Sequence, residues 1–181
     1  MWTRNSVRCY DICMAILPVL TIGNKILETK ALPVDKITPE DKKLAQDMIE
    51  TMHAEKGVGL AANQVGVLKR VFVASPDGTR GSEQVYFNPQ IIKREGTVKE
   101  FEGCLSIPEF YEPVKRSKTV WMTAMGIDGK KIEVRGAGLL SRIFQHEIDH
   151  LDGILFVDRI GLLKSKLARK KLLKKKTASK K

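Results

Sequence analysis

The sequence predicts an α+β fold, in which a helix is followed by several short antiparallel strands, a second helix and a C-terminal helix. Apolar residues recur at helical spacing before residue 57 and again after residue 138. The segment between them consists of short β-rich runs separated by turns. The 181 residues, 43% hydrophobic and 29% charged, suffice for one domain with a hydrophobic core.

The first predicted helix begins at Thr38-Pro39. Thr38 can cap the helix, Pro39 suits its first turn, and the acidic residues that follow favour the positive end of the helix dipole. Apolar residues then recur at helical spacing up to Met52, and Gly57 is expected to end the helix. We assign no function to His53, which lies near the end of this helix.

Short β-rich runs lie between the two helices. A Ser-Pro-Asp-Gly turn separates the first two runs, and Asp128-Gly129 is a hairpin signal between the last two. We therefore expect antiparallel pairing. The predicted strands cover residues 67–73, 85–92, 97–101, 119–125 and 131–134.

The second predicted helix follows Gly136 and Gly138 and covers about residues 139–151. Its apolar residues recur at helical spacing, so one side of it should face the interior of the protein. The residues expected on this inward face are Leu139, Ile143, His146, Glu147 and His150.

The positive charge of the chain lies in its C-terminal tail. The net charge is +11, and residues 159–181 contain eleven Lys or Arg and no Asp or Glu. The rest of the chain is formally neutral, with 21 basic and 21 acidic residues. We expect residues 161–181 to form a basic helix or tail, with Leu163 and Leu167 on an apolar stripe. Such a tail either aids solubility or binds an anionic partner such as RNA.

Three cysteines, at positions 9, 13 and 104, do not indicate a disulfide framework. Their odd number fits a reducing compartment, and the cytoplasm is the expected location. Residues 1–13 have no helical or strand period and are expected to be a disordered leader before a start at Met14, with a targeting extension as the alternative. Cys9 and Cys13 are interpreted as incidental thiols, although the pair could also bind a metal. No apolar run is long enough to span a membrane, and no membrane association is expected.

The strongest local signal is the H-E-x-x-H sequence of residues 146–150, within the second predicted helix. His146 and His150 leave the same face of a helix because four residues make just over one turn, so both can bind one metal ion. Glu147 lies close enough to act on a metal-bound water. The alternative is a charged surface helix, which would require this pattern by chance on an otherwise apolar face.

Cys104 is the candidate for a third metal ligand. A catalytic site usually has three protein ligands and one open position, and the sequence offers no third His within easy reach of the motif. Cys104 lies in Glu-Gly-Cys-Leu-Ser, residues 102–106, after a predicted strand. A lone Cys is more often a buried structural thiol, but a thiolate is also a strong ligand. Together with the H-E-x-x-H sequence it indicates a metal site.

A glycine-rich segment, Gly-Val-Gly-Leu-Ala-Ala-Asn-Gln at residues 57–64, is the third motif. It is not a phosphate-binding loop, because it lacks the Gly-Lys-Ser/Thr ending. As a structural element it would only end the first helix. Its small residues would also let the backbone approach a ligand closely, and the Gln64 amide could donate to a polarised oxygen.

In this order and at this spacing, the three motifs resemble the signature segments of the peptide deformylase family. The resemblance covers residues 14–160, where it implies a catalytic domain with antiparallel sheets packed around a central metal-binding helix. The family removes the formyl group from formyl-methionine at the N-terminus of newly made polypeptides and releases formate. Newly made formylated peptides would therefore be the substrates.

The resemblance also implies a role for individual residues. Glu147 would be the acid/base, while the Gln64 side chain and the Leu105 backbone N–H would stabilise the oxyanion. One divalent ion is expected, Fe(II) foremost, with Ni(II), Co(II) or Zn(II) as substitutes and water in the fourth position. The metal ligands would be Cys104, His146 and His150.

The resemblance is less specific about substrate binding. Glu102 is expected to support the site, through Arg142 or a backbone group. Many members place an Arg near the mouth of the site, where this chain has Glu109-Phe110-Tyr111. Some relatives dock on the ribosome with a C-terminal helix, so the ribosome is a second candidate partner. The substrate-binding residues would be Val58, Gly59, Gly103, Leu139 and Ile143.

Two other functions fit parts of the sequence. A zinc peptidase of the H-E-x-x-H kind would cleave internal peptide bonds and would need a third ligand other than Cys104. A nucleic-acid-binding protein with a structural metal would depend on the basic tail. Its closed site would need a fourth ligand that the sequence does not offer.

Overall fold

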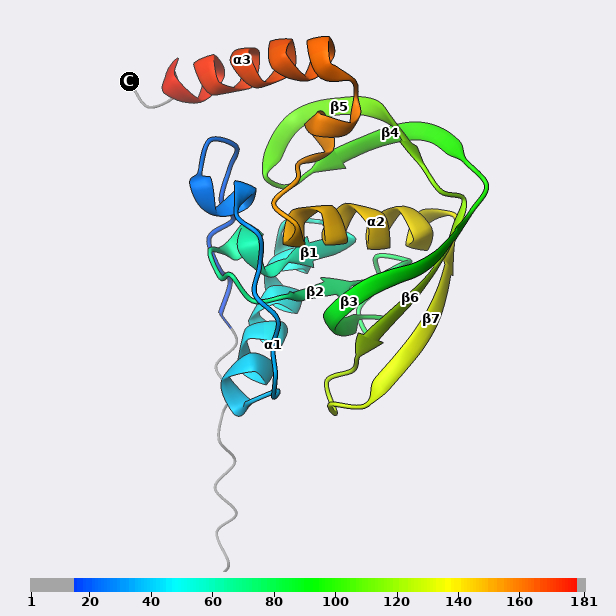
Figure 1. The fold of residues 1–181 in the computed structure, drawn as a ribbon. Helices are drawn as coiled ribbons and strands as arrows, with labels where there is room; N and C mark the ends of the chain where they lie inside the picture. Colours follow the sequence, from blue (N-terminus) through cyan, green and yellow to red (C-terminus); the bar gives the residue numbers. More distant parts are fainter. Residues whose placement is uncertain (1–14, 179–181) are drawn as a thin grey trace, which may run out of the picture.

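Helix α2 (Leu139–Leu151) lies between two antiparallel sheets (Figure 1). The structure is a computed structural model, and it describes residues 15–178. A five-stranded sheet with the order β1-β2-β3-β6-β7 packs on one side of α2, and the two-stranded β4-β5 sheet covers the other. The predicted α+β fold, with antiparallel sheets around a central helix, is confirmed.

The predicted strands at 85–92, 97–101, 119–125 and 131–134 are confirmed as β3, β4, β6 and β7, whereas β1 and β5 were not predicted. The Asp128-Gly129 hairpin joins β6 and β7, and β3 and β4 are longer than predicted. Residues 67–70 were wrongly predicted as strand, because Leu32 approaches Lys69 there and only an isolated bridge forms. The strands are β1 (Gly59–Ala61), β2 (Val71–Ala74), β3 (Gln84–Glu95), β4 (Val98–Cys104), β5 (Ile107–Arg116), β6 (Thr119–Met125) and β7 (Lys131–Ala137).

Helix α1 (Pro39–Ala54) begins and ends as predicted. The Thr38 hydroxyl accepts from the Asp41 N–H, and the Asp41 carboxylate accepts from the Thr38 N–H at 2.9 Å, so each side chain satisfies a backbone donor of the other residue. Gly57 donates to the Met52 carbonyl at 2.8 Å, just beyond the helix. Three short 3-10 helices complete the fold: η1 (Lys25–Glu28), η2 (Ala62–Val65) and η3 (Phe156–Arg159).

The packing of α2 on the five-stranded sheet positions the second half of that helix. Phe144 packs against Tyr86 with ring centroids 5.2 Å apart, and both rings are buried with Phe72. A Cβ at Gly136 would lie 2.9 Å from Phe144, so β7 can approach the helix only with glycine there. This packing leaves the opposite side of α2 to face the β4-β5 sheet.

Helix α3 (Leu162–Ala178) forms the predicted C-terminal helix, and Leu163 and Leu167 of the apolar stripe lie on its exposed side. Leu163 and Leu167 are 75% and 61% exposed, whereas Ser165 and Ala168 are buried. The reason is an ion pair: Arg169 binds Asp158 of η3 at 2.7 Å, which turns a face of small residues toward the body of the protein. Leu162, Leu163 and Leu167 of α3 therefore face solvent.

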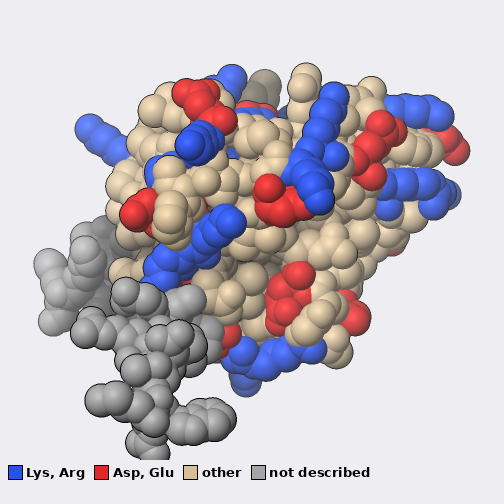
Figure 2. Space-filling model, turned by 90° about the horizontal axis from the view of Figure 1, so that it is seen from below, with Lys and Arg blue, Asp and Glu red and all other residues tan. Residues whose placement is uncertain are grey.

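Charges of both signs are interspersed on the face opposite α3 (Figure 2). This agrees with a formally neutral body and a basic tail. The predicted leader at 1–13, with Cys9 and Cys13, lies outside the described residues. No helix within residues 15–178 is long and apolar enough to cross a membrane.

Candidate active site

Cys104, His146 and His150 converge at one point between α2 and the end of β4. One potential ligand atom from each residue lies within 4.8 Å of the other two. The Cys104 Sγ is 3.1 Å from Nε2 of His150, and the two imidazole rings have centroids 4.9 Å apart. Cys104, which is 46 positions before His150, is brought to the two histidines of α2 at the end of β4 in the two-stranded sheet.

Glu102 supports His146 from the two-stranded sheet. Its Oε2 lies 3.2 Å from Nδ1 of His146, which leaves the Nε2 side of that ring for the site. Arg142 donates to the same carboxylate at 2.6 Å, as the sequence suggested. Arg116 also donates to it, through Nε at 2.9 Å and Nη2 at 3.0 Å. Although burial raises it, the hydrogen bonds and charges of His146 and Arg116 keep the pKa of Glu102 well below its usual value.

The electrostatics of the site favour a cation. Burial lowers the pKa of His146, but its hydrogen bonds with Cys104 and Glu102 outweigh this effect and raise the pKa well above the usual value. Positive charge is therefore stabilised beside these two residues. Burial lowers the pKa of His150 well below its usual value, so this imidazole stays neutral. A thiol and two imidazoles in this environment fit a divalent transition metal.

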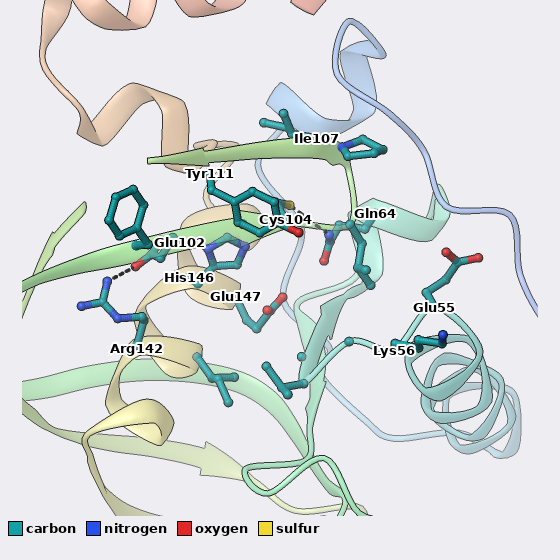
Figure 3. A pocket seen from close by; sticks show the side chains of 18 of the residues that line it. Glu55, Lys56, Gln64, Glu102, Cys104, Ile107, Tyr111, Arg142, His146 and Glu147 are labelled. Carbon is teal, nitrogen blue, oxygen red and sulfur yellow. Dashed lines mark hydrogen bonds and ion pairs between the residues drawn. The ribbon is translucent and has the colours of Figure 1, made fainter. Parts of the chain in front are cut away.

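Glu147 projects from α2 into the site (Figure 3). Its side chain is almost fully buried, and burial raises its pKa to about 7. Its Oε2 has no hydrogen-bond partner among the residues described. A Cβ on Gly59 would lie 2.5 Å from its Oε1, so the backbone of β1 can pass this carboxyl group only as glycine. A carboxyl group with this pKa can both accept and release a proton near neutral pH.

Gln64 holds a fixed orientation at the edge of the site. Its Oε1 accepts from the Ala61 N–H at 2.8 Å, which defines the amide flip. Its Nε2 then faces Ser106 Oγ at 3.2 Å and Cys104 Sγ at 3.6 Å (Figure 3). The donor side of the amide therefore points toward the proposed metal ligands.

A cavity of about 520 Å³ opens in front of these residues. His150 lies beneath it, and every other residue predicted for the site lines it. Ile143 is buried at its base, whereas Val58 and Leu139 are partly exposed at its edge. The predicted residues along the cavity are Val58, Gly59, Gln64, Gly103, Cys104, Leu105, Leu139, Ile143, His146 and Glu147.

The sequence did not point to Arg116, a buried side chain that links the carboxylate of Glu102 to that of Asp149 in α2. Its Nη1 donates to Asp149 at 2.5 Å, and Arg159 of η3 donates to the same carboxylate at 3.0 Å through Nε. Arg116 is buried and follows Lys115 in a basic run, so no sequence signal separates it from surface lysines and arginines. The ion pairs link α2 to β5 and η3.

Comparison with known proteins agrees with this geometry. The polypeptide deformylase family model matches residues 16–166. The chain belongs to the polypeptide deformylase family. It is 46% identical to the peptide deformylase of Thermodesulfovibrio yellowstonii over 165 residues, which cover 90% of this chain and 100% of that protein. It is 45% identical to that of Thermomicrobium roseum over 153 residues, covering 81% and 87%.

The fold is also that of solved deformylases. A crystal structure of a peptide deformylase from Legionella pneumophila superimposes with a TM-score of 0.85 at 40% identity, covering 92% of this chain and 99% of that one. The enzyme is therefore a hydrolase that removes the N-formyl group from nascent peptides. These findings decide against the peptidase and nucleic-acid-binding alternatives.

Proposed function

We propose that the enzyme hydrolyses the formyl amide of N-formyl-methionyl peptides with one divalent ion held by Cys104, His146 and His150. The convergence of these three ligand atoms beside a buried Glu147 is the observation that carries the proposal. A thiolate with two imidazoles suits Fe(II), the ion we favour, and also Ni(II), Co(II) or Zn(II). When bound, the ion polarises the formyl oxygen and makes water easier to deprotonate.

Glu147 moves the proton in this proposal. It takes one proton from the water that attacks the formyl carbon, and it gives this proton to the peptide nitrogen as the C–N bond breaks. Formate and a peptide with a free amino group are the products. The pKa of about 7 supports both transfers at neutral pH.

Gln64 and Leu105 stabilise the negative charge that develops on the formyl oxygen. The Gln64 amide is held by the Ala61 N–H, so its donor needs no reorientation during the reaction. Leu105 directly follows the ligand Cys104, in the turn between β4 and β5, and would contribute its backbone N–H. A donor fixed before the reaction is worth about 3 kcal/mol of barrier.

The cavity binds the substrate as an added strand beside Gly59 and Gly103. Both glycines line the cavity, and β1 and β4 bring their backbones to it. Val58, Leu139 and Ile143 supply apolar surface for the methionine side chain. We propose residues 14–160 as the catalytic domain, working in the cytoplasm, where the Cys104 thiol stays reduced.

The basic tail at 161–181 is proposed to bind the ribosome. Helix α3 lies at the edge of the molecule (Figure 1), Leu163 and Leu167 are exposed on it, and its sequence is rich in Lys and Arg. Ribosome pelleting of the full chain and of a chain ending at residue 161, at two salt concentrations, tests this proposal. Tail-dependent pelleting that weakens with salt supports it, and equal pelleting of both chains contradicts it.

The catalytic proposal is tested by formate release from formyl-Met-Ala-Ser, under anaerobic conditions with Fe(II). Wild type should release formate rapidly, and Glu147→Ala should lose nearly all activity while still binding metal. No release by folded, metal-loaded wild type would contradict the proposal.

A further inference from the structure

Two aromatic side chains stand exposed at the mouth of the cavity. Phe101 is 72% exposed and Tyr111 is 67% exposed, and both line the cavity. No other aromatic side chain within the described residues is so exposed. Aromatic rings bury large apolar areas on contact, so a pair left open at a binding cavity indicates a contact surface for the ligand.

The strand register places the two rings on one face. Phe101 of β4 pairs with Pro113 of β5. Because side chains alternate along a strand, Tyr111, two residues before Pro113, lies on the same face as Phe101. Gly103 lies on this face too, and a Cβ there would be only 2.5 Å from Cε1 of Tyr111. The Tyr111 ring therefore rests on the backbone of Gly103.

The backbone of β5 directs Tyr111 toward the cavity. Glu109 has φ +59°, an unusual conformation for a residue with a Cβ, and the register shifts between Glu102 and Cys104. After this irregularity Phe110 packs inward, with its ring centroid 6.0 Å from that of Phe156. Tyr111 consequently points outward, over the site (Figure 3).

We propose that Phe101 and Tyr111 form an aromatic shelf that binds a side chain of the substrate downstream of the formylated methionine. The inference rests on the proposed function, in which Gly103 pairs with the extended substrate. A peptide beside Gly103 must pass the Tyr111 ring as it leaves the cavity. The shelf makes the enzyme prefer a large apolar or aromatic side chain at the second or third residue of the peptide.

Three exposed charged residues also line the cavity, namely Glu55, Lys56 and Glu109. Figure 3 shows Glu55 and Lys56, which have opposite charges, away from Tyr111. Among uncharged downstream residues, the apolar contact with the shelf is therefore the contribution that distinguishes one side chain from another. Such a contact adds binding without altering the groups that move the proton, so its effect should appear in KM.

Kinetics of three peptides test the shelf: formyl-Met-Ala-Ser, formyl-Met-Phe-Ser and formyl-Met-Ala-Phe. Wild type should show a higher kcat/KM for at least one Phe peptide than for the Ala-Ser reference.

Tyr111→Ala should reduce the ratio of kcat/KM between the Phe peptide and the reference by about three- to tenfold, through KM. Phe101→Ala should act in the same direction, whereas Tyr111→Phe keeps the ring and should retain the preference. Ile92→Ala, which removes an exposed apolar side chain outside the cavity, is the control.

The outcomes separate the shelf from the reaction itself. Failure of wild type to release formate from any peptide would contradict the proposed function. The shelf proposal alone would be contradicted if Tyr111→Ala and Phe101→Ala turned over normally and kept the peptide preference of wild type. It would also be contradicted by a Tyr111→Ala variant that keeps its melting temperature but loses the same fraction of kcat on all three peptides.

Discussion

The carboxylate of Glu102 lies 3.2 Å from Nδ1 of His146, and it joins the two-stranded sheet to the helix that carries the proposed metal ligands. This contact fixes the ring orientation of His146 and directs Nε2 toward Cys104. Arg116 and Arg142 donate to the same carboxylate, so Glu102 is held from both sides. Glu102 therefore contacts both a proposed metal ligand and two buried arginines, so its replacement should affect metal binding and stability.

Glu102→Gln should weaken metal binding by about ten- to hundredfold, because His146 loses an acceptor that orients it. The variant should also be less stable by about 2 kcal/mol, since Arg116 keeps Asp149 but loses one of the two carboxylates that balance its buried charge. Chelator competition and denaturant unfolding measure the two effects. Glu100→Gln is the matched control, because Glu100 is exposed and pairs only with Arg142. Metal affinity equal to wild type in Glu102→Gln would contradict the orienting role.

Glu147→Gln should lower kcat by about 10²- to 10⁴-fold, because an amide cannot take the proton from water. The substitution keeps the shape of the side chain, so metal content and melting temperature should stay close to wild type. Steady-state formate release and metal analysis of the same preparation check this. A variant that retains more than a tenth of the wild-type kcat would show that another group moves the proton.

Gly59→Ala should reduce kcat/KM by at least tenfold, because the new Cβ would lie 2.5 Å from Glu147 Oε1 and would displace the carboxyl group. The control is Gly126→Ala, at a position remote from the cavity. Its added Cβ would lie 3.2 Å from the nearest atom, which belongs to the flexible side chain of Asp128. Kinetics with formyl-Met-Ala-Ser distinguish the two. Equal activity in both variants would mean that the site tolerates a shift of Glu147.

Asp41 should make stability depend on pH at the start of α1. Although burial opposes this, hydrogen bonds from Lys69 and Thr38 lower the pKa of Asp41 below its ordinary value of 3.8. Its contribution is therefore present above pH 3.8 and is lost as the pH falls through the lowered pKa. Asp41→Asn should cost about 1 kcal/mol at pH 7 and less at pH 3, whereas Asp35→Asn, at an exposed carboxylate, should cost little. Urea unfolding at both pH values tests this, and a constant difference would contradict it.

The central helix and the placement of the candidate residues on it could be predicted from sequence because their signals are local. His146, Glu147 and His150 share one face through helical geometry, and the hairpin at Asp128-Gly129 is specified by the turn residues themselves. The role of Gly59 beside the cavity was only partly predictable, since the glycine-rich segment at 57–64 could either approach a ligand or simply end the first helix. The structure shows instead that the segment enters the sheet as β1.

What the sequence did not predict depends on contacts between distant residues. Strand β5 contains Pro108 and Pro113, which disrupt a regular strand pattern, and it forms through pairing with β4. Arg116 has no local signal, because burial against Glu102 distinguishes it from surface basic residues. The apolar stripe with Leu163 did not indicate which side of α3 faces the body, because the ion pairs of that helix determine it.

A Co(II) titration of the metal-depleted enzyme tests the proposed metal centre most directly. A thiolate ligand gives a charge-transfer absorption in the near ultraviolet, so wild type should bind one equivalent of Co(II) with this band. Cys104→Ser should lose the band, and a variant with Ser at both positions 9 and 13 should keep it. Absence of stoichiometric binding in wild type, or a band that survives in Cys104→Ser, would contradict a site built from Cys104, His146 and His150.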